Sequence, residues 1–186
     1  MWSEEKIESY LRDNLENKRF LHSLSVRDTA VKMAKVYNID VEKSKIAGLV
    51  HDCAKNMKKS DLIKIVEENN YKIDEVSKDN PGLLHGLAGA IIARDVMGID
   101  DKEIFDAVAY HTTGRKNMSV LEKIIYLADY IEPLRNYPGV DELRKISLED
   151  LDKAMIQSFN YTIKYIIERN QMIHLNTVEA RNFLLK

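Results

Sequence analysis

The chain has 186 residues, of which 45% are hydrophobic and 31% charged, and its formal net charge is -2. This length suits one domain around one hydrophobic core, and the composition excludes an intrinsically disordered chain. The nearly balanced charge excludes an overall basic face of the kind that binds nucleic acid.

The first residues of the chain, Met1–Glu5, are acidic and polar, whereas a signal peptide needs a basic segment followed by an apolar one. The longest apolar stretch, 88–93, is far shorter than the ~20 residues that a membrane-spanning helix needs. The single cysteine, Cys53, excludes an internal disulfide and a thiolate-rich zinc site. We therefore expect a soluble cytoplasmic protein with no membrane or nucleic-acid partner, and a packing role for Cys53.

Apolar residues recur at spacings of three and four along almost the whole chain, and only 7 Gly and 3 Pro interrupt them. This pattern predicts an all-α protein, a single-domain helical bundle without strands. The predicted helices span residues 4–16, 18–37, 41–55, 59–69, 83–97, 101–112, 118–132, 148–168 and 176–185. Ser60, Ser147 and Thr177 are predicted to mark helix N-termini, and Asn80–Gly82 to form a turn.

The segment 45–55 contains the pair His51-Asp52, which follows five residues that are apolar on nearly every side. Such a helix is predicted to lie in the middle of the bundle, which places both side chains deep. A carboxylate is almost never fully buried alone, because its desolvation costs several kcal/mol. Asp52 therefore requires a cation or strong hydrogen-bond donors.

A second carboxylate lies on the predicted helix that ends near residue 132. An apolar stripe runs along this helix through Leu121, Ile124, Ile125, Ala128 and Ile131. Asp129 lies one turn beyond Ile125 and about 40° away from it around the helix axis. Its side chain is therefore predicted to point partly into the bundle.

Four histidines with apolar neighbours complete the set of unusual polar residues: His22, His51, His85 and His111. Each one alone fits an ordinary structural role. Together, four imidazoles and two carboxylates without thiolate suit Fe, Mn, Co or Zn, as one octahedral ion or two bridged ions. The sequence therefore predicts a metal centre.

The order of these residues, from His22 through His51-Asp52, His85 and His111 to Asp129, resembles the H…HD…H…H…D signature of the HD phosphohydrolase superfamily. Longer local sequences resemble the bacterial YqeK family more specifically. They are the segments 19–23, 51–55, 85–86, 111–114 and 126–133.

This resemblance implies one HD domain over 1–186, with a motif core at about 18–132 and C-terminal helices within 148–185 packing on it. It implies that a first metal is bound by His22, His51, Asp52 and Asp129. His85 and His111 resemble the additional pair that binds a second metal or the substrate phosphates. The implied cofactor is iron, one or two ions, with Mn or Co as substitutes.

The activity that the resemblance implies is the symmetrical hydrolysis of diadenosine tetraphosphate (Ap4A) to two ADP. In this interpretation Asp52 holds the metal, a metal-activated water attacks phosphorus, and His85 and His111 position the phosphates, so these three are the candidate catalytic residues. Two alternatives stay open: another HD nucleotidase or phosphodiesterase, and a non-catalytic metal or nucleotide sensor. The oligomeric state is also open, and a homodimer is compatible with the sequence.

Candidate nucleotide-binding residues lie close to the motifs. Lys55 follows His51 by one helical turn, and Arg135 follows the helix that carries Asp129. Solvated surface positions are the alternative for these two and for Ser25, and an ordinary loop residue is the alternative for His174. The full candidate set is Ser25, Lys55, His85, His111, Thr112, Asp129, Arg135 and His174.

Overall fold

The computed structural model describes all 186 residues and is entirely helical, which confirms the all-α prediction. The helices are α1 (Glu4–Asn14), α2 (Asn17–Val36), α3 (Val41–Val50), α4 (Lys59–Glu68), α5 (Glu75–Asp79), the 3-10 helix η1 (Pro81–Leu84), α6 (His85–Asp95), α7 (Lys102–Ala109), α8 (Val120–Ile131), α9 (Val140–Glu149), α10 (Leu151–Glu168) and α11 (Leu175–Phe183). None of them has both the length and the apolar composition needed to cross a bilayer.

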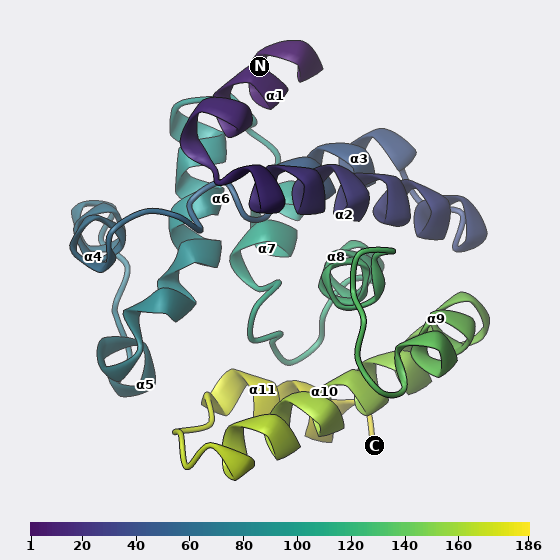
Figure 1. Cartoon of the computed structure of the whole chain (residues 1–186). Coiled ribbons are helices and arrows are strands. Elements are labelled where there is room, and N and C mark those ends of the chain that lie inside the picture. Colours follow the sequence, from purple (N-terminus) through teal and green to yellow (C-terminus); the bar gives the residue numbers. More distant parts are fainter.

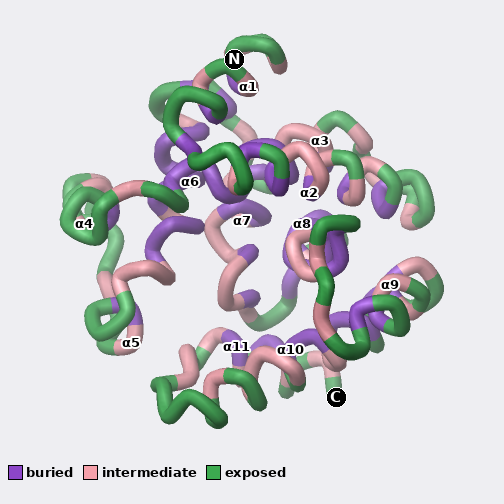
Figure 2. The backbone as a smooth tube through the Cα atoms, in the orientation of Figure 1, coloured by how far each residue is buried: buried purple, intermediate pink, exposed green.

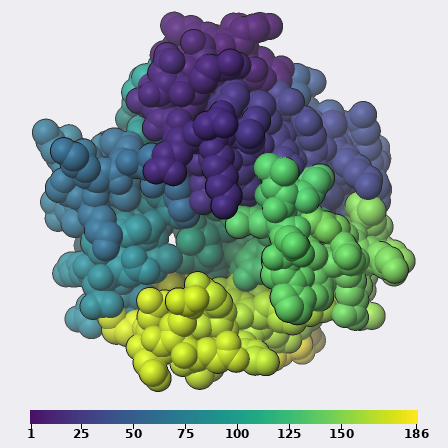
Figure 3. All heavy atoms as spheres, in the orientation of Figure 1, coloured from purple at the N-terminus to yellow at the C-terminus, as the bar shows by residue number.

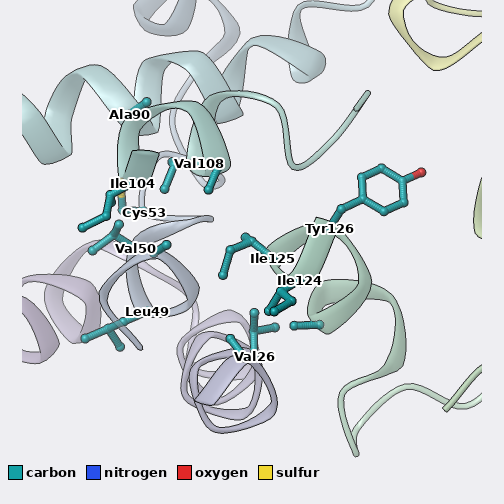
Figure 4. Close-up of a cluster of buried hydrophobic side chains, with 14 of the residues drawn as sticks. Val26, Leu49, Val50, Cys53, Ala90, Ile104, Val108, Ile124, Ile125 and Tyr126 are labelled. Atoms are coloured by element: carbon teal, nitrogen blue, oxygen red, sulfur yellow. The ribbon is translucent and has the colours of Figure 1, made fainter. Parts of the chain in front are cut away.

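Helix α8 lies in the middle of the bundle, where Figure 1 shows it end-on between α2 and α3 above and α10 below. Buried residues make up most of α6 and α8, whose tubes are mainly purple in Figure 2. The close-up in Figure 4 shows the contacts between four helices, made by Val26 of α2, Leu49 and Val50 of α3, Ile104 and Val108 of α7, and Ile124 and Ile125 of α8. Burial of this apolar surface is the main force that holds the helices together.

Helices α2 and α3 approach each other closely at Gly48. A Cβ atom at this position would lie 2.9 Å from the Cα atom of Arg27 and 3.2 Å from the Cβ atom of Ala30. The absence of a side chain therefore sets the separation of the two helices. This close packing brings His22 of α2 near His51 at the end of α3, with ring centroids 5.3 Å apart.

The C-terminal helices pack on the centre of the bundle from below. The Phe159 ring of α10 contacts the buried Tyr126 ring of α8, with centroids 4.9 Å apart. Gly114 has a positive φ of 66°, and a Cβ atom there would meet the Phe159 ring at 2.7 Å. Thr177 of α11 donates a hydrogen bond to the Thr113 carbonyl over 2.8 Å, so α11 is fastened to the turn after His111.

Several predicted helix boundaries were wrong. Ser147 does not begin a helix but lies inside α9, where its hydroxyl donates to the Arg144 carbonyl; Asp150 caps α10 by accepting from the Lys153 amide. Helix α4 begins at Lys59, as the predicted range 59–69 has it, although Ser60 does not cap it; α11 begins at Leu175 with His174, not Thr177, marking its N-terminus. The structure also contains α5 and α9, which apolar periodicity did not indicate.

The predicted helix 41–55 ends earlier than expected, because α3 stops at Val50 and residues 51–56 form turns. Cys53 lies in these turns. Its side chain is buried and donates from Sγ to the Gly89 carbonyl over 3.5 Å. Burial, together with the nearby Asp52 carboxylate, raises the pKa of the Cys53 thiol to about 12. The thiol is therefore neutral and inaccessible, as a packing role requires.

We predict that Cys53 in the native protein reacts with a disulfide reagent only as fast as the fold opens. A raised pKa keeps the nucleophilic thiolate scarce, and burial blocks the reagent. The measurement is the labelling rate at mildly alkaline pH, with protein unfolded in denaturant as the fast-reacting control. Equally fast labelling of native and unfolded protein would contradict the packing role.

Candidate metal centre

Six predicted ligands from different parts of the chain converge on one point of the bundle. They are His22 of α2, His51 and Asp52 after α3, His85 at the start of α6, His111 after α7 and Asp129 of α8. Two triads within this set have ligand atoms within 4.8 Å of one another: His22, His51 and Asp129, and His51, Asp52 and His111. All but Asp129 are buried, and the Asp129 side chain is 21% exposed.

Three of the histidines have the same local geometry, because each follows a helical turn whose carbonyl its ring can reach. The Nδ1 atoms of His51, His85 and His111 bind the carbonyl oxygens of Gly48, Gly82 and Val108 over 2.8, 2.5 and 2.7 Å. A carbonyl only accepts, so each Nδ1 carries the ring proton and each Nε2 of the neutral ring keeps a free lone pair. The backbone thus aims three Nε2 atoms at the centre.

The fourth histidine is oriented by a residue that the sequence analysis missed, Glu132. This buried side chain accepts from His22 Nδ1 over 3.0 Å through Oε1 and from the Leu134 amide over 2.6 Å through Oε2. His22 therefore also presents Nε2 to the centre. Glu132 lies three residues after Asp129, on the same side of the helix end, and this spacing was the signal that could have revealed it.

Three of the inward-facing polar atoms have no hydrogen-bond partner. His22 Nε2, His51 Nε2 and Asp52 Oδ1 are buried without any hydrogen bond. Orphaned polar atoms of this kind are costly in a protein interior. They also face other acceptors, since His22 Nε2 lies 2.9 Å from Asp129 Oδ1 and Asp52 Oδ1 lies 3.1 Å from His85 Nε2. Lone pairs that converge in this way fit a divalent metal ion, and nitrogen and oxygen donors without sulfur suit a first-row metal.

The two carboxyl groups are ionised. Burial alone would raise the pKa of Asp52, but the neighbouring imidazoles of His51, His111 and His85 outweigh it and hold that pKa well below its usual value. Burial acts in the same direction on Asp129, where His22, His51 and Arg135 likewise lower the pKa. Both groups are therefore anionic at neutral pH.

Three cationic side chains border the centre. Arg19 Nη1 lies 2.7 Å from Asp52 Oδ2, and Arg135 pairs with the Asp129 carboxylate. Lys55 Nζ lies 3.1 Å from His85 Nε2 and 3.9 Å from Asp52 Oδ1. Lys55 and Arg135 were sequence candidates, whereas Arg19 was not, although it precedes His22 by three residues on the same helix.

A cleft of about 540 Å³ leads from the surface to this centre. Figure 3 shows the hollow where the N-terminal half of the chain, the green segment after α8 and the yellow C-terminal helices meet. Its walls include six of the candidate nucleotide-binding residues: Lys55, His85, His111, Thr112, Asp129 and His174. We refer to it as the first cleft.

The remaining candidates lie around this cleft in different ways. Thr112 Oγ1 is 3.3 Å from the Nε2 atoms of both His85 and His111, so its hydroxyl can serve either ring. His174 lines the cleft as the N-cap of α11, and its Nε2 lies 3.1 Å from Asp74 Oδ2. Arg135 and Ser25 do not line the first cleft.

The arrangement matches known proteins in sequence and in structure. The HD domain family model matches residues 19–134, which contain all six converging ligands. "Bis(5'-nucleosyl)-tetraphosphatase, symmetrical" from Bacillus subtilis is 37% identical over 94% of both chains. The protein of the same name from Halalkalibacterium halodurans is 39% identical over 94% of this chain and 93% of its own.

A solved structure extends this similarity to the whole fold. The crystal structure of a predicted HD superfamily hydrolase involved in NAD metabolism, from Clostridium acetobutylicum, superposes with a TM-score of 0.98. It covers 100% of this chain and 98% of the other, at 55% identity. Because the family match includes every converging ligand and the relatives align over nearly their full length, this chain belongs to the HD domain family, in the group of the symmetrical bis(5'-nucleosyl)-tetraphosphatases.

Proposed function

We propose that this protein is a cytoplasmic, metal-dependent hydrolase that cleaves Ap4A symmetrically into two ADP. The observation that carries the proposal is the cluster of unpartnered ligand atoms at the end of an open cleft, in a chain whose relatives at 35–39% identity bear the name of this activity. The lone, reduced cysteine supports the cytoplasmic location.

The proposed cofactor is iron, as one or two ions, with Mn or Co as substitutes. His22, His51, Asp52 and Asp129 would hold the first ion, and His85 and His111 would hold a second ion or the phosphates. Four imidazoles and two anionic carboxylates form a donor set of the borderline hardness that suits these metals. A bound divalent ion would lower the pKa of a water molecule and withdraw charge from phosphoryl oxygens.

The protein's own residues have complementary tasks. Burial lowers the pKa of His85, so that its ring is neutral at neutral pH and Nε2 can accept the proton that an attacking water loses. His111 Nε2 lies 3.1 Å away and, with the Thr112 hydroxyl, positions that water or a phosphoryl oxygen. Lys55, at 3.1 Å from His85 Nε2, is placed to neutralise phosphate charge.

We predict that the protein loses Ap4A hydrolysis when its metal is removed by a chelator and regains it with Fe²⁺. Mn²⁺ and Co²⁺ should restore part of the turnover, and the only product should be ADP. The measurement is chromatographic product analysis, with a panel of other nucleotides and a phosphodiester as comparison substrates. Faster cleavage of another substrate would favour a different HD enzyme, and metal-dependent binding without turnover would favour a sensor.

We predict that Asp52→Ala and His85→Ala differ in kind. Asp52→Ala removes an anionic ligand next to two imidazoles and should lose metal and activity together. His85→Ala leaves His22, His51, Asp52 and Asp129 in place, so it should keep at least one metal per chain while turnover falls by about 10²-fold or more. Metal content and kinetics on the same samples decide this. If His85→Ala is emptied of metal as fully as Asp52→Ala, the assignment is wrong.

We predict that Glu132→Gln weakens metal binding about 10- to 100-fold, as the loss of an outer carboxylate partner of a ligating histidine does. The glutamine amide would point a donor at either His22 Nδ1 or the Leu134 amide, which are both donors. Metal affinity from competition with a chelator is the readout. Glu122→Gln is the matched control, because Glu122 is equally buried but pairs with Arg115. Equal metal affinities in the two variants would show that Glu132 does not support metal binding.

A further inference from the structure

A second cleft, also of about 540 Å³, reaches the metal centre from the side of α2 and the segment after α8. His22 and Glu132 line it, whereas His85, His111 and Asp129 line the first cleft. Lys55 is the residue common to the walls of both. The metal centre therefore lies where two clefts meet, and each cleft has the volume of a small-molecule site, about 300–1,000 Å³.

The second cleft is the more basic of the two. Its walls carry Lys18, Arg19, Lys55 and Arg135 against two carboxylates, Glu16 and Glu132. Three of these groups already have partners: Glu132 is bound by His22 and the Leu134 amide, Arg19 pairs with Asp52, and Arg135 pairs with Asp129. The first cleft balances two lysines, Lys55 and Lys59, against two aspartates, Asp79 and Asp129. The charged lining of the second cleft therefore has an excess of cationic side chains that the first cleft lacks, and this excess favours a polyphosphate chain there.

Apolar surface accompanies these cations. Leu134 lines the second cleft and is 61% exposed. The neighbouring Tyr137 ring is held in place, because its hydroxyl donates to the Tyr130 carbonyl over 3.0 Å and its ring packs edge-on against the Tyr130 ring. An exposed leucine and a fixed aromatic ring offer a surface for a nucleoside.

The proposed reaction requires a place for two nucleoside diphosphates. Water oxygen forms a bond to one of the two central phosphorus atoms, and the bond from that phosphorus to the central bridging oxygen breaks. The other ADP departs with the bridging oxygen and its negative charge. One proton of the water passes to a base at the centre, and the second leaves to solvent as the new phosphate oxygen ionises. A cut in the middle of Ap4A therefore leaves one ADP on each side of the metal centre.

We propose that the second cleft binds the departing ADP half of the substrate, which rests on the proposed function above. Lys18 and Arg19 bind its phosphates, and Leu134 and Tyr137 flank its nucleoside. Arg19 lies between the second cleft and the metal centre, since it lines this cleft and its Nη1 atom lies 2.7 Å from Asp52 Oδ2. The first cleft, which His85 and His111 line, holds the half that is attacked.

The test is the number of ADP molecules that the metal-loaded protein binds, measured by calorimetric titration, together with Ap4A kinetics. We expect two ADP per parent chain and one in the double variant Lys18→Glu/Leu134→Glu, whose substitutions lie at exposed positions. Loss of a charged contact to phosphate and its replacement by repulsion should lower kcat/KM for Ap4A at least about tenfold. Metal content should not change.

Lys64→Glu is the control, because Lys64 is 71% exposed on α4 and lines neither cleft. It should bind two ADP and hydrolyse Ap4A at the parent rate. A single ADP per parent chain, or a double variant that equals the control, overturns the assignment of the second cleft. If the metal-loaded parent does not hydrolyse Ap4A at all, the proposed function itself fails.

Discussion

At the centre of this protein, each buried imidazole donates its Nδ1 proton to an acceptor that the fold holds in place. For His51, His85 and His111 the acceptor is a carbonyl three residues earlier, and for His22 it is the Glu132 carboxylate. This constraint fixes the tautomer of every ring, so all four Nε2 atoms enter the centre as lone-pair donors. Metal affinity and the proton-accepting role proposed for His85 both depend on it.

Two features of the helix packing bring these side chains together. Gly48 lets α2 and α3 approach closely, and α8, surrounded by other helices, brings Asp129 and Glu132 to the same end of the bundle. The cost is a group of ionised and orphaned polar atoms inside an apolar core. A bound metal compensates this cost, and its binding energy then adds to the stability of the fold.

Local patterns in the sequence were enough to predict the helical class and the two inward carboxylates. The apolar surroundings of His51-Asp52 indicated burial, and both residues are buried; the flank position of Asp129 matches its partial exposure. The short helix α5 was not predicted, because its five residues contain too few apolar positions to show a helical period. Ser147 was wrongly predicted to begin a helix. A serine whose hydroxyl donates to a carbonyl inside a helix cannot be distinguished by sequence alone from a serine that caps a helix.

Contacts between residues that are far apart in the sequence could not be predicted either. Nothing local in the sequence pairs Arg19 with Asp52, or Glu132 with His22 across 110 residues. The walls of the two clefts likewise combine residues that are far apart in the sequence. The family match covers 19–134, yet residues outside it line both clefts. They include Thr162, Tyr165, Met172 and His174 in the first cleft, and Glu16, Lys18, Arg135, Asn136 and Tyr137 in the second. The matched segment contains all six converging residues and part of both cleft walls, and residues outside it complete those walls. A shared fold can in this way carry sites of different shape.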